Sequence, residues 1–229
     1  RLPERAQNRL GLTALIGAAG VLCFAPFGLF WLAPVVWLGL FLVLRRAHSP
    51  REAALNGLAF GLGFFLTGVS WVYVSLSVFG GMPWWLAAIA AFLFCAVMAV
   101  FPALAGWLFK RWQPAEPWRQ ALFFAALIAA VDWLRSWIFT GFPWLAAGYS
   151  QAPPSPLAGF APVFGVHGLS LLVALCGALL LRCKSGLAFL AATAAIGLGL
   201  RQVQWTEPVG EPVRVALIQG NIPQEMKFR

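Results

Sequence analysis

The chain alternates between long apolar runs and short clusters of Lys and Arg, and this alternation constrains its fold more than any other feature. The apolar segments lie at roughly 10–25, 27–44, 53–74, 83–109, 121–139, 162–181 and 186–200. Several approach the roughly 20 residues with which an α-helix crosses a ~30 Å hydrocarbon core. The pattern predicts an all-α polytopic membrane bundle of about seven transmembrane helices within a domain spanning residues 1–205.

The composition agrees with a membrane protein. Hydrophobic residues make up 61% of the chain and charged residues 10%, whereas a soluble domain is about half apolar and about a quarter charged. The net charge of +9 is high enough to suggest nucleic acid. However, the basic residues lie in short clusters between apolar runs, as in cytoplasmic membrane loops. We therefore expect the bilayer as a partner and no nucleic acid.

The basic residues also predict the orientation, because Lys and Arg are enriched in cytoplasmic loops. They occur before the first apolar segment and after the second, fourth and sixth: Arg1, Arg5 and Arg9; Arg45, Arg46 and Arg51; Lys110, Arg111 and Arg119; Arg182 and Lys184. The alternate loops, near 25–28, 75–83 and 140–161, contain none. This distribution predicts a cytoplasmic N-terminus and a C-terminal tail on the opposite side.

The tail, 206–229, differs in character from the rest. Two prolines, Pro208 and Pro212, precede an apolar segment at 213–220 that begins with alternation and ends at a glycine, which is typical of a β-strand. A single strand is not stable without a partner. We therefore interpret the tail as a linker and the first strand of an external α/β domain, and the chain as a fragment of a longer protein.

Two patterns in the chain predict packing, and of the residues concerned only Cys183 lies outside the apolar segments. The four cysteines, Cys23, Cys95, Cys176 and Cys183, show no metal-ligand spacing. We interpret them as small packing residues and expect no metal or other cofactor. Gly57 and Gly61 form a GxxxG motif, which allows close helix contact. In a protein with several spans this motif indicates internal packing.

The two longer uncharged loops are rich in aromatic residues, with glycine and proline between them. The candidate lipid-binding residues of these loops are Trp71, Tyr73, Phe79, Met82, Phe142, Trp144 and Tyr149. Aromatic side chains at this level can simply anchor helices among the lipid headgroups. Alternatively, loops on a rigid helical scaffold often carry function, and the pair of loops then indicates a lipid-handling surface.

Polar residues within the apolar segments are the remaining candidates. Asp132 and Arg135 are spaced i, i+3, so they share one helical face and can pair with each other. His167 falls at a similar depth in the membrane. The pair is either a structural ion pair or a binding site for a lipid headgroup, since intramembrane ionisable residues are often functional. His167 is either a packing residue or part of the same site.

Several motifs, in order, resemble those of bacterial apolipoprotein N-acyltransferases. They are Trp71-Val72-Tyr73-Val74-Ser75, Phe79-Gly80-Gly81-Met82-Pro83, Leu134-Arg135, Thr140-Gly141-Phe142-Pro143-Trp144 and Gly148-Tyr149-Ser150-Gln151. The tail from Val215 to Gln224 resembles the entry into that family's nitrilase-like domain. The resemblance covers essentially the whole chain. Asp132 stands where related sequences often carry Glu.

The resemblance implies a bacterial inner-membrane enzyme of eight spans, with a periplasmic nitrilase-like domain between the last two. Such enzymes transfer an acyl chain from a phospholipid to the diacylglyceryl-cysteine amine of an apolipoprotein. The family uses a cysteine nucleophile helped by a glutamate and a lysine, which lie beyond residue 229. We therefore expect no catalytic residue in this chain, no activity of this chain alone, and a monomer.

Two other classes fit the composition. A transporter or channel fragment without covalent chemistry usually has several intramembrane charges, broken helices or repeated halves. The sequence offers one acidic–basic pair and no clear repeat. A membrane scaffold that docks a soluble partner would gain support if the gene ended near residue 229.

Overall fold

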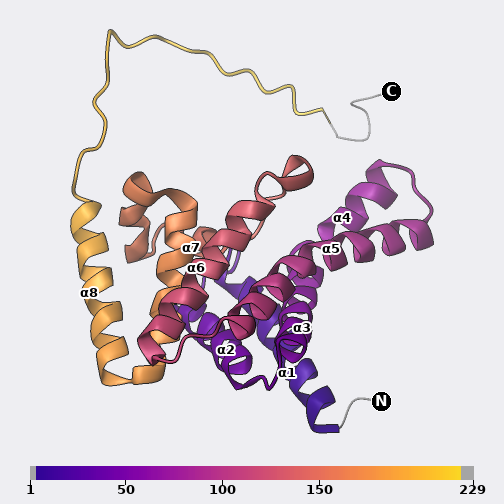
Figure 1. The fold of residues 1–229 in the computed structure, drawn as a ribbon. Coiled ribbons are helices and arrows are strands. Elements are labelled where there is room, and N and C mark those ends of the chain that lie inside the picture. Colours follow the sequence, from indigo (N-terminus) through magenta and orange to yellow (C-terminus); the bar gives the residue numbers. More distant parts are fainter. Residues whose placement is uncertain (1–3, 223–229) are drawn as a thin grey trace.

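The computed structural model describes residues 4–222, and these residues form helices and connecting loops without any β-strand (Figure 1). The main helices are α1 (Glu4–Gly20), α2 (Ala33–Arg46), α3 (Pro50–Gly68), α4 (Trp71–Val74), α5 (Trp84–Arg111), α6 (Pro117–Arg135), α7 (Ala161–Leu179) and α8 (Lys184–Leu200). Short helical turns join them, η1 (Val21–Cys23), η2 (Phe30–Leu32), η3 (Ser75–Phe79), η4 (Ile138–Thr140), η5 (Ala147–Gln151), η6 (Pro156–Phe160) and η7 (Leu180–Arg182). The predicted all-helical class is confirmed.

Length and hydropathy identify fewer spans than the seven predicted. Among residues 4–222, two helical stretches are long and apolar enough to cross a membrane, Trp84–Arg111 and Pro156–Arg182. A third is added if α3 and the following stretch Trp71–Phe79, bent by 50°, count as one broken span. Asn8–Cys23 and α8 are shorter apolar helices. The structure thus has two to three candidate spans, and the count of seven stays a prediction.

Helix α3 begins where its sequence dictates and ends earlier than predicted. Ser49 caps the N-terminus by accepting a hydrogen bond from the Glu52 N–H at 3.1 Å, and Pro50 occupies the first turn, where its missing N–H costs nothing. The apolar segment at 53–74 was expected to be one helix. Instead α3 stops at Gly68 and the chain turns before α4, at a Gly/Ser-containing stretch of the kind where helices kink.

Small residues bring α1, α3 and α5 together. A Cβ atom added at Gly57 would overlap the Pro102 carbonyl of α5, and one at Gly61 would lie 2.7 Å from the Ala99 Cα. On the α1 side, a Cβ at Gly63 would overlap the Ala14 carbonyl. Backbones this close exclude any side chain larger than hydrogen. The prediction that the GxxxG motif serves internal packing is confirmed.

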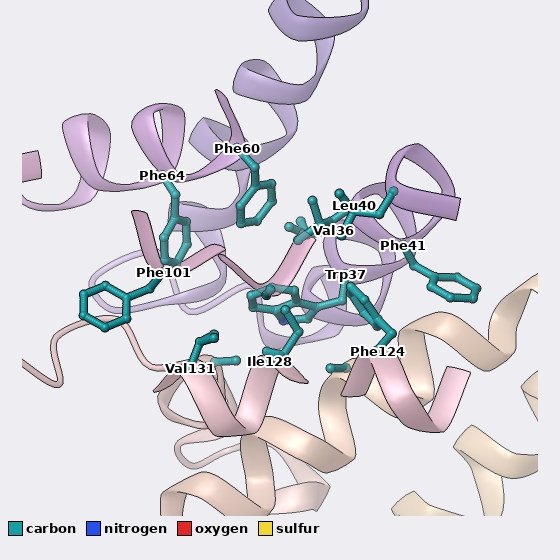
Figure 2. Close-up of a cluster of buried hydrophobic side chains, with 14 of the residues drawn as sticks. Val36, Trp37, Leu40, Phe41, Phe60, Phe64, Phe101, Phe124, Ile128 and Val131 are labelled. Atoms are coloured by element: carbon teal, nitrogen blue, oxygen red, sulfur yellow. The ribbon is translucent and has the colours of Figure 1, made fainter. Parts of the chain in front are cut away.

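An aromatic core fills the space between α2, α3, α5 and α6. Figure 2 shows Trp37 of α2 in the middle of this cluster, between Phe60 and Phe64 of α3 and Ile128 and Val131 of α6. The ring centroids of Trp37 and Phe60 are 5.6 Å apart, within the range of favourable aromatic pairs. The core therefore packs α2 against both α3 and α6.

The basic clusters gather at one end of the bundle, which we call the basic end. Arg45 donates to the Gln120 side chain at 2.9 Å, Lys110 donates to the Arg45 carbonyl at 3.3 Å, and Arg9 pairs with Glu52 at 2.6 Å. The link between α7 and α8 lies at the same end (Figure 1). The opposite end, called the loop end, carries residues 70–83 and 136–156.

The predicted strand at 213–220 does not form in the structure. Residues 211–222 are exposed and irregular, and they follow α8 as a chain that leaves the bundle (Figure 1). A strand needs a neighbour to accept and donate its backbone hydrogen bonds, and residues 4–222 supply none. The last part of the predicted tail, 223–229, lies outside the described residues.

Candidate functional site

A buried ion pair lies at the end of α6, on the side of the loop end. Arg135 is 2% exposed and Asp132 is 7% exposed. The Arg135 Nη2 atom lies 3.1 Å from the Asp132 Oδ1 atom. The predicted pairing of these two residues is confirmed. Buried charges of this kind are costly unless they are paired and hydrogen-bonded, so the remaining bonds of each residue decide what the pair does.

Arg135 folds the following loop around its own guanidinium. Its Nη1 donates to the carbonyl oxygens of Phe142 at 2.5 Å and Trp144 at 2.6 Å. In return, the Phe142 N–H donates to the Arg135 carbonyl at 2.8 Å. The guanidinium also lies over the Phe65 ring of α3, 5.3 Å from its centroid, a cation–π distance. Arg135 thereby fixes the backbone of two aromatic residues that the sequence singled out.

Asp132 holds the next part of the loop both directly and through Ser170, a residue that the sequence patterns did not single out. Its Oδ2 accepts from the Ala147 N–H at 2.7 Å and from the Ser170 hydroxyl at 2.8 Å. Ser170, on α7 and 0% exposed, also accepts from the Gly148 N–H at 2.9 Å. The sequence does contain a signal that could have identified Ser170, because it is the one hydroxyl residue in the apolar segment 162–181. The carboxylate thus joins α6, η5 and α7.

A chain of aromatic contacts extends from this network toward α4 and α5. Trp144 lies beside Trp71 of α4, with ring centroids 5.4 Å apart, and beside Phe142 at 6.2 Å. Phe142 meets Phe94 of α5 edge-on at 4.9 Å. The structure therefore brings together Trp71, Phe142 and Trp144, and it adds Phe94, which was not predicted.

A groove of about 420 Å³ runs between α5 and the chain that follows α6. Apolar side chains form most of its lining, which consists of Leu93, Phe94, Val97, Met98, Phe101, Ile138, Phe139 and Phe142 together with Thr140, Gly141 and Arg135. Its volume falls within the ~300–1,000 Å³ typical of ligand pockets. The α5 residues were not predicted, because their periodic spacing is also that of an ordinary lipid-facing helix.

The other predicted residues lie around this centre. Tyr73 is on α4, Phe79 ends η3, and Met82 follows in the turn where its N–H donates to the Leu76 carbonyl. Tyr149 lies in η5, which Asp132 and Ser170 hold, and its side chain is half exposed. His167 on α7 is partly buried, and its Nδ1 has no hydrogen-bond partner among residues 4–222.

Large apolar side chains remain exposed at the loop end. Phe139 is 84% exposed, Trp84 72% and Val78 67%. No group of three or more His, Cys, Asp or Glu residues that could hold a metal ion occurs in the part of the chain that the structure describes.

These features define a helical membrane protein in which a buried ion pair holds an aromatic, uncharged loop surface at one end of the bundle. A family model described as the apolipoprotein N-acyltransferase N-terminal domain matches residues 16–179. The chain belongs to the apolipoprotein N-acyltransferase family.

Individual relatives agree with this assignment. A protein of Nitrosomonas europaea named apolipoprotein N-acyltransferase is 50% identical over 96% of this chain and 46% of its own length. Proteins of the same name from Chromobacterium violaceum and Methylococcus capsulatus are 44% and 46% identical, over 99% and 95% of this chain and 45% of their own lengths. The chain spans about half the length of the curated relatives it matches.

Proposed function

We propose that this chain is the membrane part of an enzyme that transfers an acyl chain from a phospholipid to the N-terminal diacylglyceryl-cysteine amine of apolipoproteins. Family membership and the shared name of the relatives support this reaction. The full-length protein is an acyltransferase of lipoprotein maturation. In this proposal the present chain, which spans 46% of the length of the Nitrosomonas europaea relative, supplies the membrane platform of the enzyme.

The proposal places the protein in the bacterial inner membrane. Seven spans run from a cytoplasmic N-terminus to a periplasmic tail, and the grouping of the basic clusters at one end supports this orientation. Residues 206–229 lead into a nitrilase-like domain, whose missing strands would pair with 213–220, and an eighth span follows. That domain carries the cysteine, glutamate and lysine. The enzyme works as a monomer without a cofactor.

The proposed reaction gives different roles to the membrane domain and the nitrilase-like domain. A thiolate in the nitrilase-like domain attacks the acyl ester of the phospholipid, and the lysophospholipid leaves as the thioester forms. The amine of the lipoprotein then attacks the thioester, and the thiol is released. Both substrates are lipids, so they must be presented at the bilayer surface beneath that domain. The loop end performs this presentation.

The assignment of substrate presentation to the loop end rests on one observation, which is that a buried ion pair binds the backbone of the aromatic loop. Arg135 binds the carbonyls of Phe142 and Trp144, and the bonds made by Asp132 fix η5. The pair thus positions the loop. Trp71, Tyr73, Phe79, Met82, Phe142, Trp144 and Tyr149 form the lipid-contacting surface, and His167 lies at its α7 edge.

The test replaces Trp144 by Ala, and separately Tyr73 by Ala, in the full-length protein. Acylation of a diacylated lipopeptide from phospholipid is followed by the mass shift of the peptide. We expect each rate to fall by about tenfold or more, since orientation of the substrate is lost. Trp118→Ala is a matched control, because Trp118 is half exposed like Trp144 and lies on α6 at the basic end. Unchanged rates for both Trp144→Ala and Tyr73→Ala would overturn the assignment.

A further inference from the structure

The groove beside α5 has a floor and a rim of different character. Met98 and Phe101 are each 8% exposed and Arg135 is 2% exposed, so these side chains form the buried floor. Leu93 is 56% exposed and Val97 49% exposed, and both form the rim with Phe139. Because the rim residues face outward from α5, the groove opens sideways, toward the hydrocarbon that surrounds a membrane helix.

The groove follows the axis of α5. Its lining on this helix runs from Leu93 to Phe101, eight steps along a helix that rises ~1.5 Å per residue, or about 12 Å. This stretch lies in the middle of α5 (Trp84–Arg111), a candidate span of 28 residues. A long, narrow, apolar occupant that enters from the bilayer fits this shape.

Arg135 indicates which part of a lipid lies next to the groove. Three of its N–H groups donate to protein oxygens among residues 4–222, two to the loop carbonyls and one to Asp132, and a guanidinium has further donors beyond these. Asp132 balances its charge at 3.1 Å. A neutralised guanidinium with N–H groups left over suits a neutral acceptor such as an ester carbonyl better than a phosphate anion.

We infer that this groove binds one acyl chain of the phospholipid donor along the α5 residues from Leu93 to Phe101, with its ester carbonyl toward Arg135, and that the groove selects donors by chain length. This inference rests on the proposed function, because it names where the donor of that reaction is held. The α5 residues that line the groove then determine which donor phospholipids are used. The covalent chemistry takes place in the proposed nitrilase-like domain.

The first experiment compares Val97→Trp with Val100→Trp in the full-length protein. Both valines lie on α5 and are about half exposed, at 49% and 55%, but only Val97 lines the groove. Donor phospholipids of graded acyl length are compared. We expect Val97→Trp to lower the ratio of long-chain to short-chain transfer by about tenfold or more, and Val100→Trp to leave it unchanged. Equal ratios in both variants and the wild type would overturn the inference.

A second experiment does not depend on catalysis, so it separates failure of the groove from failure of the proposed function. A phospholipid with a diazirine in its acyl chain is photolysed with the full-length protein in vesicles. We expect labels on Val97, Met98 and residues 138–142 in the wild type, reduced in Val97→Trp. Labels spread equally over Val100 and the exposed face of α8 would show ordinary boundary lipid and reject the groove.

The same labelling distinguishes the acyl ester from the headgroup. A monoacylglycerol has an acyl ester and no phosphate. We expect it to compete with the photoactivatable phospholipid for the groove. Competition restricted to phosphate-bearing lipids would reject the ester assignment of Arg135. Labelling of the groove in a protein that transfers no acyl chain would support the site and refute the proposed function.

Discussion

The α1–α3–α5 interface and the loop end are both buried in part, yet different forces hold them. At the interface, glycines such as Gly57 and Gly61 let backbones touch. At the loop end, Asp132 and Arg135 bind backbone groups through directed hydrogen bonds. Lipid tails are as apolar as leucine, so a membrane bundle relies on close packing and on hydrogen bonds rather than on the hydrophobic effect. In this protein, close packing holds the α1–α3–α5 interface, and hydrogen bonds hold the loop end.

The largest expected effect comes from Asp132→Ala. It leaves the Arg135 charge buried without its partner and removes the acceptor of Ala147 and Ser170. Breaking a buried ion pair in this way costs about 3–5 kcal/mol. We expect a lower unfolding free energy in mixed micelles and faster hydrogen exchange at the Ala147 and Gly148 amides.

The loss of structure caused by Asp132→Ala should be confined to the loop end. Exchange in α1 should stay close to that of the wild type, because the side-chain hydrogen bonds of Asp132 reach only α6, η5 and α7. Helix α3 meets the pair through the contact of Arg135 with Phe65. Glu116→Ala removes a carboxylate from an exposed pair with Arg119 and serves as the control, with an effect below about 1 kcal/mol. If Asp132→Ala loosened the interface as much as the loop, the two regions would not be independent.

An intermediate effect is expected from Gly57→Ala. The added Cβ would overlap the Pro102 carbonyl, and overpacking of this kind costs about 1–3 kcal/mol. The control is Gly11→Ala on α1, where a Cβ would meet nothing within 4 Å. Ala is a better helix former than Gly by up to about 1 kcal/mol, so this control should be neutral or stabilising in the same unfolding assay.

Combining Gly57→Ala with Asp132→Ala tests whether the interface and the loop end are energetically independent. Independent sites add to within about 0.5 kcal/mol. A double variant whose loss of unfolding free energy equals the sum of the two single losses would support separate regions. A clearly smaller or larger loss would show that α3 transmits strain between them.

The smallest expected effect concerns the contact between Trp71 and Trp144. Their rings lie 5.4 Å apart and join α4 to the loop. A double-mutant cycle with Trp71→Ala and Trp144→Ala should give a coupling energy of about 0.5–1.5 kcal/mol. Trp84, which is 72% exposed, replaces Trp71 in the control cycle and should show no coupling to Trp144. Zero coupling for Trp71 would mean that α4 is not held by the loop.

Local patterns in the sequence predicted much of the fold. Apolar runs placed the helices, the i, i+3 spacing predicted the Asp132–Arg135 pair, and GxxxG predicted a close interface. Each of these signals comes from residues near one another in the chain, where helix geometry alone decides which side chains meet. The break after Gly68 was missed because the apolar character of the segment continues through it.

The composition of the site depends on contacts between helices that are distant in the sequence. Asp132 meets Ser170 across 38 residues of sequence, and Phe94 meets Phe142 from a different helix. The groove exists because the chain after α6 folds back over α5. No local pattern specifies such contacts, since they depend on how separate helices pack. The order of the amino acids was enough to predict a helical membrane protein with a pair of charges in its fifth apolar segment. Packing determined that this pair holds an aromatic loop, because a buried charge is costly unless it is paired and hydrogen-bonded, and the fold brings the loop carbonyls and the Ala147 amide within reach.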